Sequence, residues 1–335
     1  SKALKRNPYP LGGMQVIMCG DFFQLPPVTR RDRSKEATAS FLEKKEGLDF
    51  VTESAVWKEM QLRVCYLDEQ FRQDDRSFLR VLNDIRNGDV SEVSVRSLSE
   101  RLGKDISGYS KPTRLFTHNA DVDAINKQHL EALSTEPQEY MMGWNGSFGI
   151  AETLKKSCLA PEQLVLKKGA QVMFVKNNYE VGYVNGTLGE VIDFDKDNFP
   201  VVRTFDGAEI VVTPAKWEVK EDDEVKASID QLPLRLAWAI TVHKSQGMSL
   251  DAADIDLSRS FLPGMGYVAL SRVRSLSGLK LMGMNQMALQ VHPDVAQMDK
   301  QFIAHSNEAV KYLYEMDKEK KKQMQEDFLA FMKGE

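Results

Sequence analysis

The chain has 335 residues, of which 42% are hydrophobic and 28% charged, a balance typical of globular proteins that excludes a disordered, collagen-like or coiled-coil chain. Forty-four Lys and Arg against 49 Asp and Glu give a net charge of −5, so any nucleic-acid site must be a local patch. No apolar run approaches the ~20 residues that span a bilayer, and no signal peptide is recognised. The three widely spaced cysteines exclude a disulfide framework and a cysteine zinc site, and fit a reducing compartment.

The first predicted elements flank a loop. Residues 14–19 (MQVIMC) are a continuous apolar run between glycines, which predicts a short buried strand. Residues 20–28 (GDFFQLPPV) contain two adjacent prolines and predict a loop at the carboxyl end of that strand, the edge where α/β sheets bind ligands. Residues 29–50 are polar and predict an excursion over the surface.

Further strands and helices follow in alternation. A strand is predicted over residues 62–67, and then a helix over residues 77–88 with Ser77 as its N-cap and Gly88 as its C-cap. The next unit begins at Pro112, with a strand over residues 114–117 and a helix over residues 120–133 that Asn119 or Asp121 can cap.

From residue 171 to residue 219 the pattern changes to short strands separated by turn residues. Asn185-Gly186 and Asp206-Gly207 are strong hairpin signals, so a small antiparallel barrel or sheet is predicted as an insertion in an α/β domain.

The last third of the sequence returns to helices and buried strands. Pro233 can open a helix over residues 232–247, which is apolar almost all round and therefore expected to be buried. Strands over 253–257 and 279–282, with a helix over 267–273 between them, predict a parallel sheet of the nucleotide-binding type. The stretch from Glu308 predicts a charged, solvated helix.

Four residues could serve phosphate chemistry. Gln24 offers a neutral amide that can sense a terminal phosphate, and Asp21 lies beside it, but both also fit a simple turn. Arg72, between a strand and a helix, is either a surface ion-pair partner or a guanidinium that neutralises transferring oxygens. Arg272 has apolar neighbours, and a charge there is costly unless it meets an anion, which favours a functional role.

The segment VHKSQG (242–247) supplies groups suited to a nucleic-acid backbone. Lys244 and Ser245 provide a cation and a hydroxyl, and Gly247 permits a left-handed exit. The alternatives are a solvated helix end for Lys244 and a packed imidazole for His243. The five histidines are scattered along the chain, which excludes a histidine metal site.

Four aromatic residues could stack on bases. The core is the favoured place for Trp238, both interpretations stay open for Phe22 and Phe23, and Trp144 is the fourth candidate.

Taken in order, several segments resemble one family. They are GGMQVIMCGDFFQLPPV, QFRQDDRSFLRVLNDIRNG, KKGAQVMFVKN, VNGTLGEV, AITVHKSQGMSLD and GYVALSRVRS. From Leu11 to about Met282 the chain resembles the petite integration frequency (PIF) family of superfamily-one B helicases, relatives of RecD. The resemblance implies α/β RecA-like domains with parallel sheets, 5′-to-3′ unwinding driven by ATP and Mg²⁺, and single-stranded and forked DNA as partners.

The resemblance also implies roles for individual residues. Gln24 corresponds to the γ-phosphate sensor, and Arg72 and Arg272 to two arginine fingers, so these three are the catalytic candidates. The nucleotide-binding set adds three further residues, Asp21, Gln246 and Gly247. The DNA-binding candidates are Asn119, His243, Lys244 and Ser245. Residues 1–110 would be the carboxyl part of a first RecA-like domain, and residues 111–335 a second domain with a small barrel over 177–232.

One departure from the family is large. The sequence contains no G-x-x-x-x-G-K-[ST] phosphate loop and no Asp-Glu pair before residue 12 to hold Mg²⁺. We therefore expect a helicase lacking its N-terminal phosphate-loop half, inactive by itself, in the bacterial cytoplasm or in a eukaryotic nucleus or mitochondrion. The alternatives are a non-catalytic single-strand-binding or regulatory module and one half of a split helicase whose complementing N-terminal half is a separate polypeptide.

Overall fold

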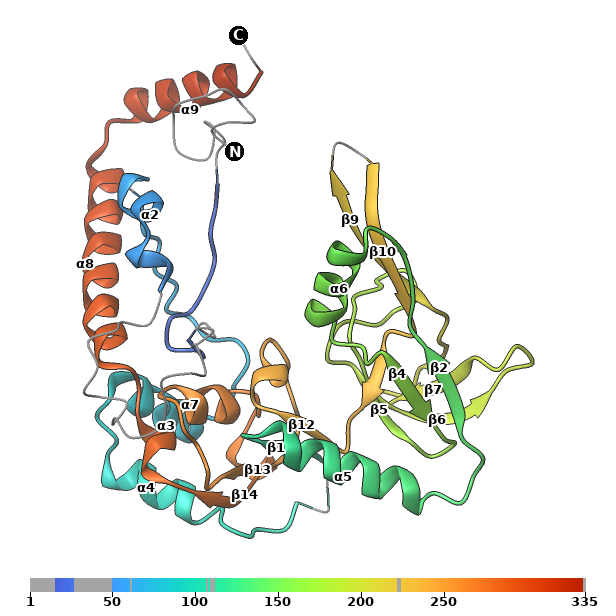
Figure 1. The fold of residues 1–335 in the computed structure, drawn as a ribbon. Helices are drawn as coiled ribbons and strands as arrows, with labels where there is room; N and C mark the ends of the chain where they lie inside the picture. Colours follow the sequence, from blue (N-terminus) through green and yellow to red (C-terminus); the bar gives the residue numbers. More distant parts are fainter. Residues whose placement is uncertain are drawn as a thin grey trace, which may run out of the picture. The chain divides into compact units, whose positions relative to one another are not determined.

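The computed structural model describes residues 16–26, 50–60, 62–106, 108, 112–221 and 224–333. The chain forms two compact units, each discontinuous in sequence (Figure 1). The first comprises residues 1–71, 86–88 and 291–335, and the second comprises residues 72–85 and 89–290. Within the described ranges, no helix combines the length and the apolar character needed to cross a membrane.

Helices make up the regular structure of the first unit's described residues. They are η2 (Val51–Glu53), α2 (Ala55–Glu59), α8 (Pro293–Glu315) and α9 (Lys318–Lys333). Ser54 caps α2 by accepting a hydrogen bond from the Trp57 amide, and α8 starts at a proline, whose missing N–H costs nothing in a first turn. The charged C-terminal helix predicted from residue 308 is the end of α8 together with α9, and its side chains are mostly exposed.

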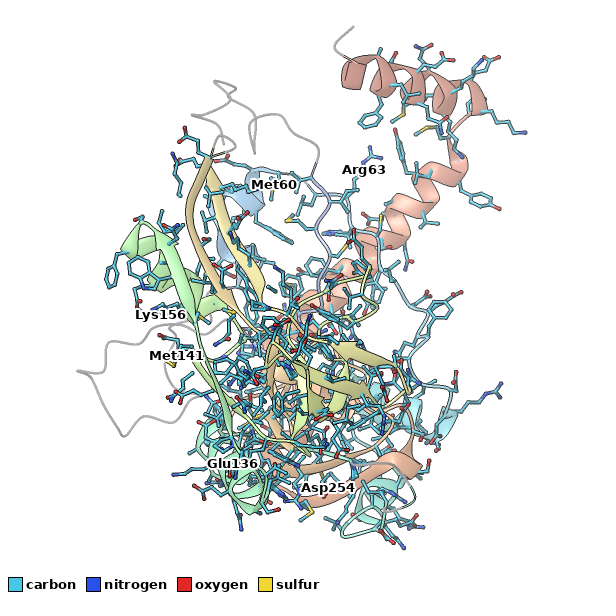
Figure 2. The ribbon with its side chains drawn as sticks, turned by 90° about the vertical axis from the view of Figure 1, so that its right-hand side faces the viewer. Met60, Arg63, Glu136, Met141, Lys156 and Asp254 are labelled. Carbon is cyan, nitrogen blue, oxygen red and sulfur yellow. The ribbon has the colours of Figure 1, made fainter. Side chains whose placement is uncertain are left out.

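The two strands predicted for this unit do not form among its described residues. Residues 16–20 have no regular structure, and Ile17 is 82% exposed, while Met14 and Gln15 lie outside the described residues. Residues 62–67 have no regular structure and contact α8. The Tyr66 amide donates to Ser306 Oγ at 3.0 Å, and the Arg63 guanidinium, labelled in Figure 2, lies 5.5 Å from the centre of the Tyr312 ring. An apolar run predicts burial but does not say which backbone will pair with it. The predicted surface excursion at residues 29–50 lies outside the described residues except for Phe50.

A parallel sheet organises one part of the second unit. Its strands, in spatial order, are β12 (Ala239–Thr241), β1 (Thr113–Phe116), β13 (Ala253–Leu257) and β14 (Leu279–Met284). Every neighbouring pair is parallel, which confirms the predicted arrangement. Helices α5 (Asn119–Ala132) and α7 (Met265–Leu270) follow β1 and β13 along the chain (Figure 1).

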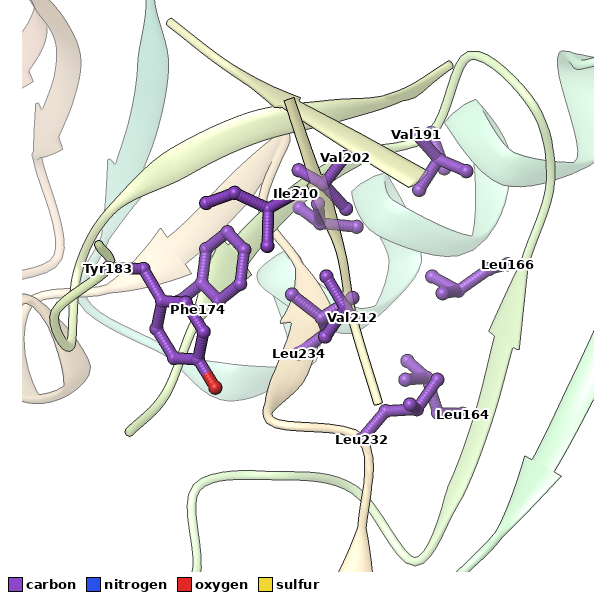
Figure 3. Packing of buried hydrophobic residues seen from close by; sticks show 12 residues of the cluster. Leu164, Leu166, Phe174, Tyr183, Val191, Val202, Ile210, Val212, Leu232 and Leu234 are labelled. Atoms are coloured by element: carbon purple, nitrogen blue, oxygen red, sulfur yellow. The ribbon is translucent and has the colours of Figure 1, made fainter. Parts of the chain in front are cut away.

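An antiparallel sheet forms a second part of this unit, as predicted. Its spatial order is β11 (Leu234–Leu236), β5 (Gln171–Phe174), β6 (Leu188–Phe194), β7 (Pro200–Thr204) and β8 (Glu209–Val211). The predicted turn glycines, Gly186 and Gly207, have φ of +95° and +100°, which an L side chain rarely adopts. Figure 3 shows the core of this sheet, where the Phe174 and Tyr183 rings stack with centroids 4.2 Å apart.

Smaller elements complete the second unit. The strand elements are β2 (Gln138–Met141) paired with β4 (Gln163–Leu166), and a three-stranded sheet of β3 (Gly143–Gly146), β10 (Glu224–Gln231) and β9 (Ala215–Glu221). The helical elements are α4 (Glu92–Ser99), α6 (Phe148–Ser157), η3 (His243–Ser245), η4 (Leu276–Gly278) and η5 (Gln286–Leu289). Helix α3 (Arg76–Asn87) runs into the first unit at residues 86–88.

The predicted helix over residues 232–247 was wrong. The segment instead contains β11, which pairs with β5, and β12, which pairs with β1, followed by the short turn of η3. All three residues of β12 are buried. The helix was predicted because the run is apolar almost all round, a pattern that a buried strand and a buried helix share.

The predicted helix caps were also partly wrong. Asp75, not Ser77, caps α3, because its Oδ1 accepts hydrogen bonds from the amides of Ser77 (3.0 Å) and Phe78 (3.2 Å). Helix α5 begins at Asn119 with His118 in the N-cap position, which makes no side-chain cap bond, so neither Asn119 nor Asp121 is the cap. Gly88 ends α3 with φ +70°, as predicted.

We predict that Gly266→Ala destabilises the protein strongly. A Cβ at Gly266 in α7 would lie 1.9 Å from the Ala288 carbonyl oxygen, so the backbone must shift. Overpacking of this kind costs about 1–3 kcal/mol. Gly149→Ala in α6 is the matched control: nothing lies within 4 Å of its Cβ, and helical alanine is favoured by about 0.5–1 kcal/mol. Urea unfolding followed by circular dichroism measures both, and equal midpoints for the two variants would contradict the close packing at Gly266.

Candidate functional site

Residues 72–75, which precede α3, are hydrogen-bonded to residues 271–276, which follow α7. Arg72 Nη1 donates to the Ser271 carbonyl at 3.2 Å. Gln73, which is 6% exposed, donates from Nε2 to the same carbonyl at 2.9 Å and to the Val273 carbonyl at 3.2 Å. One buried amide and one guanidinium therefore hold two stretches of chain together that lie about 200 residues apart.

A third segment, which follows VHKSQG, joins the same place. Arg72 Nε donates to Ser249 Oγ at 2.9 Å. The Leu250 amide donates to the Arg272 carbonyl at 2.8 Å, and the Arg274 amide donates to the Leu250 carbonyl at 3.1 Å. Arg72, the exit from VHKSQG and Arg272, which the sequence singled out separately, thus form one hydrogen-bonded junction.

Arg272 is the more deeply placed of the two arginines. Its side chain is 2% exposed, its Nε donates to the Val268 carbonyl at 2.9 Å, and its Nη2 donates to Ser271 Oγ at 2.8 Å. Since a buried charge is tolerated only when it is hydrogen-bonded, these contacts explain how the guanidinium persists in an apolar helix end. Both arginines contact Ser271, so the structure brings these two catalytic candidates together.

Asp75 reinforces the junction. Its Oδ2 accepts a hydrogen bond from the Leu276 amide at 3.1 Å, while its Oδ1 caps α3. Burial alone raises the pKa of this carboxyl, but the hydrogen bonds from Ser77, Leu276 and Phe78 outweigh it and lower the pKa below its ordinary value. Asp75 therefore stays ionised at neutral pH, and its position ties the start of α3 to η4.

Three DNA-binding candidates lie at one edge of the parallel sheet. Strands β1 and β12 are parallel neighbours, and the Val242 amide donates to the Phe116 carbonyl at 2.9 Å where both strands end. Asn119 follows β1 and is exposed, whereas His243 and Lys244 follow β12 and are half-buried. The carboxyl ends of parallel strands are where α/β proteins place their ligands.

Ser245 is placed differently from these candidates. It is fully buried, and its hydroxyl donates to the Val242 carbonyl at 2.8 Å. The hydroxyl thus supports the η3 turn in this structure and is not presented at the surface. Next to it, Gln246 is exposed, and Gly247 has φ +80° with open space around its Cβ position, which is the predicted left-handed exit.

The electrostatics of η3 distinguish its two basic residues. Burial lowers the pKa of His243, so the imidazole is neutral at pH 7. Burial and the nearby Arg235 guanidinium lower the pKa of Lys244, and Asp123 partly opposes them. Lys244 is therefore a partly desolvated cation beside a second cation.

Arg235 is a basic residue that the sequence interpretation missed. It lies on β11, its Nη1 donates to the Leu159 carbonyl at 3.2 Å, and its Nε is buried with no hydrogen-bond partner among the described residues. The only signal in the sequence was a charge inside an apolar run, and that run was assigned to a helix.

The first unit holds the remaining catalytic candidate. Residues 21–24 form a turn in which the Gln24 amide donates to the Asp21 carbonyl at 3.2 Å. Asp21 Oδ1 accepts from the Phe23 amide at 3.1 Å and forms an ion pair with Arg86 at 3.2 Å. The Asp21 carboxylate is thus engaged within the protein, as a turn aspartate would be.

Gln24 belongs to the first unit, whereas Arg72 and Arg272 belong to the second. The end of the predicted loop, Pro27 and Val28, lies outside the described residues.

Three of the four aromatic candidates are packed against other side chains. Phe23 is 4% exposed, and Trp238 stacks on His129 with ring centroids 5.4 Å apart. The Phe22 ring contacts those of Phe50, Trp57 and Phe302. Trp144 remains 47% exposed on β3, beside Phe148.

Among the described residues, no group of three or more His, Cys, Asp or Glu side chains is arranged to hold a metal ion. The guanidinium and amide groups of Arg72, Arg272 and Gln24 match phosphate oxygens in chemistry, but the sequence has no phosphate loop.

Comparison with protein families gives two matches. Residues 2–96 match the model of the PIF1-like helicase family, and residues 150–194 match the 2B domain of the DNA helicase Pif1. The chain is 37% identical to the ATP-dependent DNA helicase Pif1 of Psychrobacter sp., covering 99% of this chain and 58% of that protein. It is 36% identical to the human ATP-dependent DNA helicase PIF1, covering 88% of this chain and 44% of that protein. The chain thus spans about half the length of the curated relatives.

Solved structures agree with these matches. The Bacteroides sp. Pif1 complex with ADP-AlF4 has 32% identity and a TM-score of 0.73, covering 91% of this chain and 71% of that one. The Candida albicans Pif1 helicase has 34% identity and a TM-score of 0.70, covering 90% and 71%. A Bacteroides Pif1 complex with ADP-AlF3 and single-stranded DNA has 33% identity and a TM-score of 0.62, covering 94% and 70%. By sequence and by fold, this chain belongs to the PIF1-like helicase family.

Proposed function

We propose that this chain is the motor-core portion of an ATP-dependent 5′-to-3′ DNA helicase that translocates on single-stranded DNA. The observation that carries the proposal is the junction at Ser271, where two arginines suited to a nucleotide and the exit of a segment suited to DNA are hydrogen-bonded together. The names of the relatives, and their complexes with ADP-AlF4, single-stranded DNA and forked DNA, support it.

The proposed enzyme uses two RecA-like domains. Residues 1–110 are the carboxyl part of the first, and residues 111–335 are the second, with a small barrel inserted over residues 177–232. The antiparallel strands β6, β7 and β8 fall within this insertion and support the barrel. The phosphate loop and the acidic pair that holds Mg²⁺ are supplied by residues outside this chain.

In the proposed nucleotide site, Arg72 and Arg272 neutralise the oxygens of the terminal phosphate during transfer, and Gln24 senses that phosphate. Asp21 supports Gln24 through the turn that both residues share. To reach a phosphate, the Arg272 guanidinium exchanges its bond to Ser271 Oγ for a bond to a phosphate oxygen. Arg72 is less buried and makes its contact from the same junction.

In the proposed DNA site, Lys244 binds a backbone phosphate, and Asn119 and the neutral His243 contact the strand beside it. Ser245 contributes only when its hydroxyl leaves the Val242 carbonyl. Gln246 and Gly247 connect this site to Ser249, which Arg72 contacts, so occupancy by DNA and occupancy by nucleotide are coupled through four residues of chain.

A second candidate function is a non-catalytic, single-strand-binding or regulatory module, or one half of a split helicase. The absence of a phosphate loop from the sequence favours it. The arginine junction disfavours a pure binding module, which needs no groups for a terminal phosphate.

We predict that the purified 335-residue chain has no DNA-stimulated ATPase activity, because its sequence contains no phosphate loop to cradle the β- and γ-phosphates. A coupled phosphate-release assay with single-stranded DNA measures this. Adding the phosphate-loop portion, in the same polypeptide or as a separate one, restores ATP turnover if the protein is a helicase. If it is a binding module, the addition produces no ATP turnover. Turnover by the chain alone would refute the prediction.

We predict that Arg272→Ala, in the protein that includes the phosphate-loop portion, lowers ATP turnover by about 10³-fold or more, as removal of other arginine fingers does. Affinity for single-stranded DNA stays within about threefold, because the guanidinium that is removed donates to the Val268 carbonyl and to Ser271 Oγ, neither of which is a DNA-binding candidate. Arg274→Ala is the control, since Arg274 makes an exposed ion pair with Asp251 at 3.0 Å that is worth under about 1 kcal/mol. Retained turnover in Arg272→Ala would remove the finger role.

We predict that Lys244→Ala makes the salt dependence of single-stranded DNA binding shallower. Losing one phosphate contact lowers the slope of log K against log[salt] by about 0.7. His243→Ala is the control, because a neutral imidazole releases no counterion and its loss leaves the slope unchanged. Fluorescence anisotropy with a labelled oligonucleotide at four salt concentrations measures both slopes, and equal slopes for wild type and Lys244→Ala would assign Lys244 a structural role.

A further inference from the structure

The Arg86 guanidinium is a centre of contacts in the first unit. Its Nη1 lies 3.2 Å and 3.3 Å from the two carboxylate oxygens of Asp21, and its Nη2 donates to the Tyr66 hydroxyl at 3.1 Å. The guanidinium carbon of Arg86 lies 4.2 Å from the centre of the Phe23 ring, and Nη2 forms an ion pair with Asp299 of α8 at 3.7 Å. A single side chain thus reaches two residues of the turn and one residue of α8.

The residues that Arg86 contacts are the ones that shape the Gln24 turn. Asp21 closes this turn twice, since its carbonyl accepts from the Gln24 amide and its Oδ1 accepts from the Phe23 amide. Arg86 holds that same carboxylate and lies over the Phe23 ring, so it contacts two of the three residues that precede Gln24 in the turn.

Helix α8 contacts Phe22 of this turn and also Tyr66, whose hydroxyl accepts a hydrogen bond from Arg86. The Tyr66 hydroxyl donates to Asp299 Oδ1 at 2.8 Å, its amide donates to Ser306 Oγ at 3.0 Å, and the Phe22 and Phe302 rings lie 5.6 Å apart. The side chains of Arg86, Asp21 and Asp299 are only 21%, 22% and 19% exposed. Partial burial reduces the screening of these charges by salt. The planar Arg86 guanidinium, which contacts Asp21, Phe23, Tyr66 and Asp299, is restricted in its rotation.

We propose that Arg86 is a positioning residue that sets the orientation of the Gln24 turn, with Tyr66 and Asp299 anchoring it to α8. The proposal rests on the proposed role of Gln24 as the sensor of the terminal phosphate. A positioning role has a catalytic consequence because a displacement of about 1 Å at a reacting centre can cost about 10²-fold in rate.

The first test asks whether Arg86 orients the turn, and it uses the 335-residue chain. Arg86→Ala is expected to speed amide hydrogen exchange at Phe23 and Gln24 at least tenfold while exchange in α7 stays unchanged. Arg80→Ala, an exposed arginine on the same helix, is expected to change neither. Unchanged exchange at Phe23 and Gln24 in a folded Arg86→Ala chain would overturn the proposal, whatever the protein's activity.

The second test asks whether this orientation serves the sensor, and it uses the protein with its phosphate-loop portion. Arg86→Ala is expected to lower kcat of DNA-stimulated ATP hydrolysis about 10²-fold with little change in KM for ATP. Arg86→Lys, which keeps the charge without the planar fork, is expected to recover only part of the loss.

A double-mutant cycle with Gln24→Ala completes the test. If Arg86 acts through Gln24, Arg86→Ala has little further effect in the Gln24→Ala background, whereas additive losses would overturn the positioning role. If Gln24→Ala alone leaves kcat unchanged, the sensor role fails, and faster exchange at the turn then still distinguishes an orienting Arg86 from an inert one.

Discussion

The carbonyl oxygen of Ser271 accepts hydrogen bonds from Arg72 and Gln73, and the arrangement of the second unit's candidate site depends on this contact. Ser271 is the C-cap of α7, where the last carbonyls of a helix have no partner in the helix. Arg272 meets the same requirement one turn earlier by donating to the Val268 carbonyl. The two arginines therefore satisfy a helix end, where cations are favoured by the helix dipole. The same two side chains are the ones that we propose to bind a terminal phosphate.

Much of the second unit could be predicted from the sequence because its strands are short apolar runs bounded by turn residues. This holds for β1, β13 and β14 and for the hairpins at Gly186 and Gly207. The segment 232–247 could not be predicted in the same way, because whether a continuous apolar run is helix or strand depends on its partners. Here β5 and β1, which both precede the segment in the sequence, provide those partners.

The candidate site, too, could be predicted only in part from the sequence. The chemical types of Arg72, Arg272 and Lys244 were evident from their setting and from the resemblance. Their mutual contacts were not, because Gln73, Ser249 and the Ser271 carbonyl have no distinctive sequence pattern. Asp21 shows the opposite case: its residue type left a turn aspartate and a nucleotide-binding residue both open, and the structure pairs it with Arg86, 65 positions away. Such pairings arise only when the chain folds, so residue type alone cannot reveal them.

The neighbouring charges of Lys244 and Arg235 have a consequence for the proposed DNA site. Lys244 is partly removed from water, and its burial and the nearby Arg235 guanidinium lower its pKa, while Asp123 opposes them. In the proposed function, a phosphate bound at Lys244 offsets this repulsion, and a ligand that binds only the folded state adds to its stability. The repulsion returns when that phosphate leaves, which favours binding of the next phosphate along the strand.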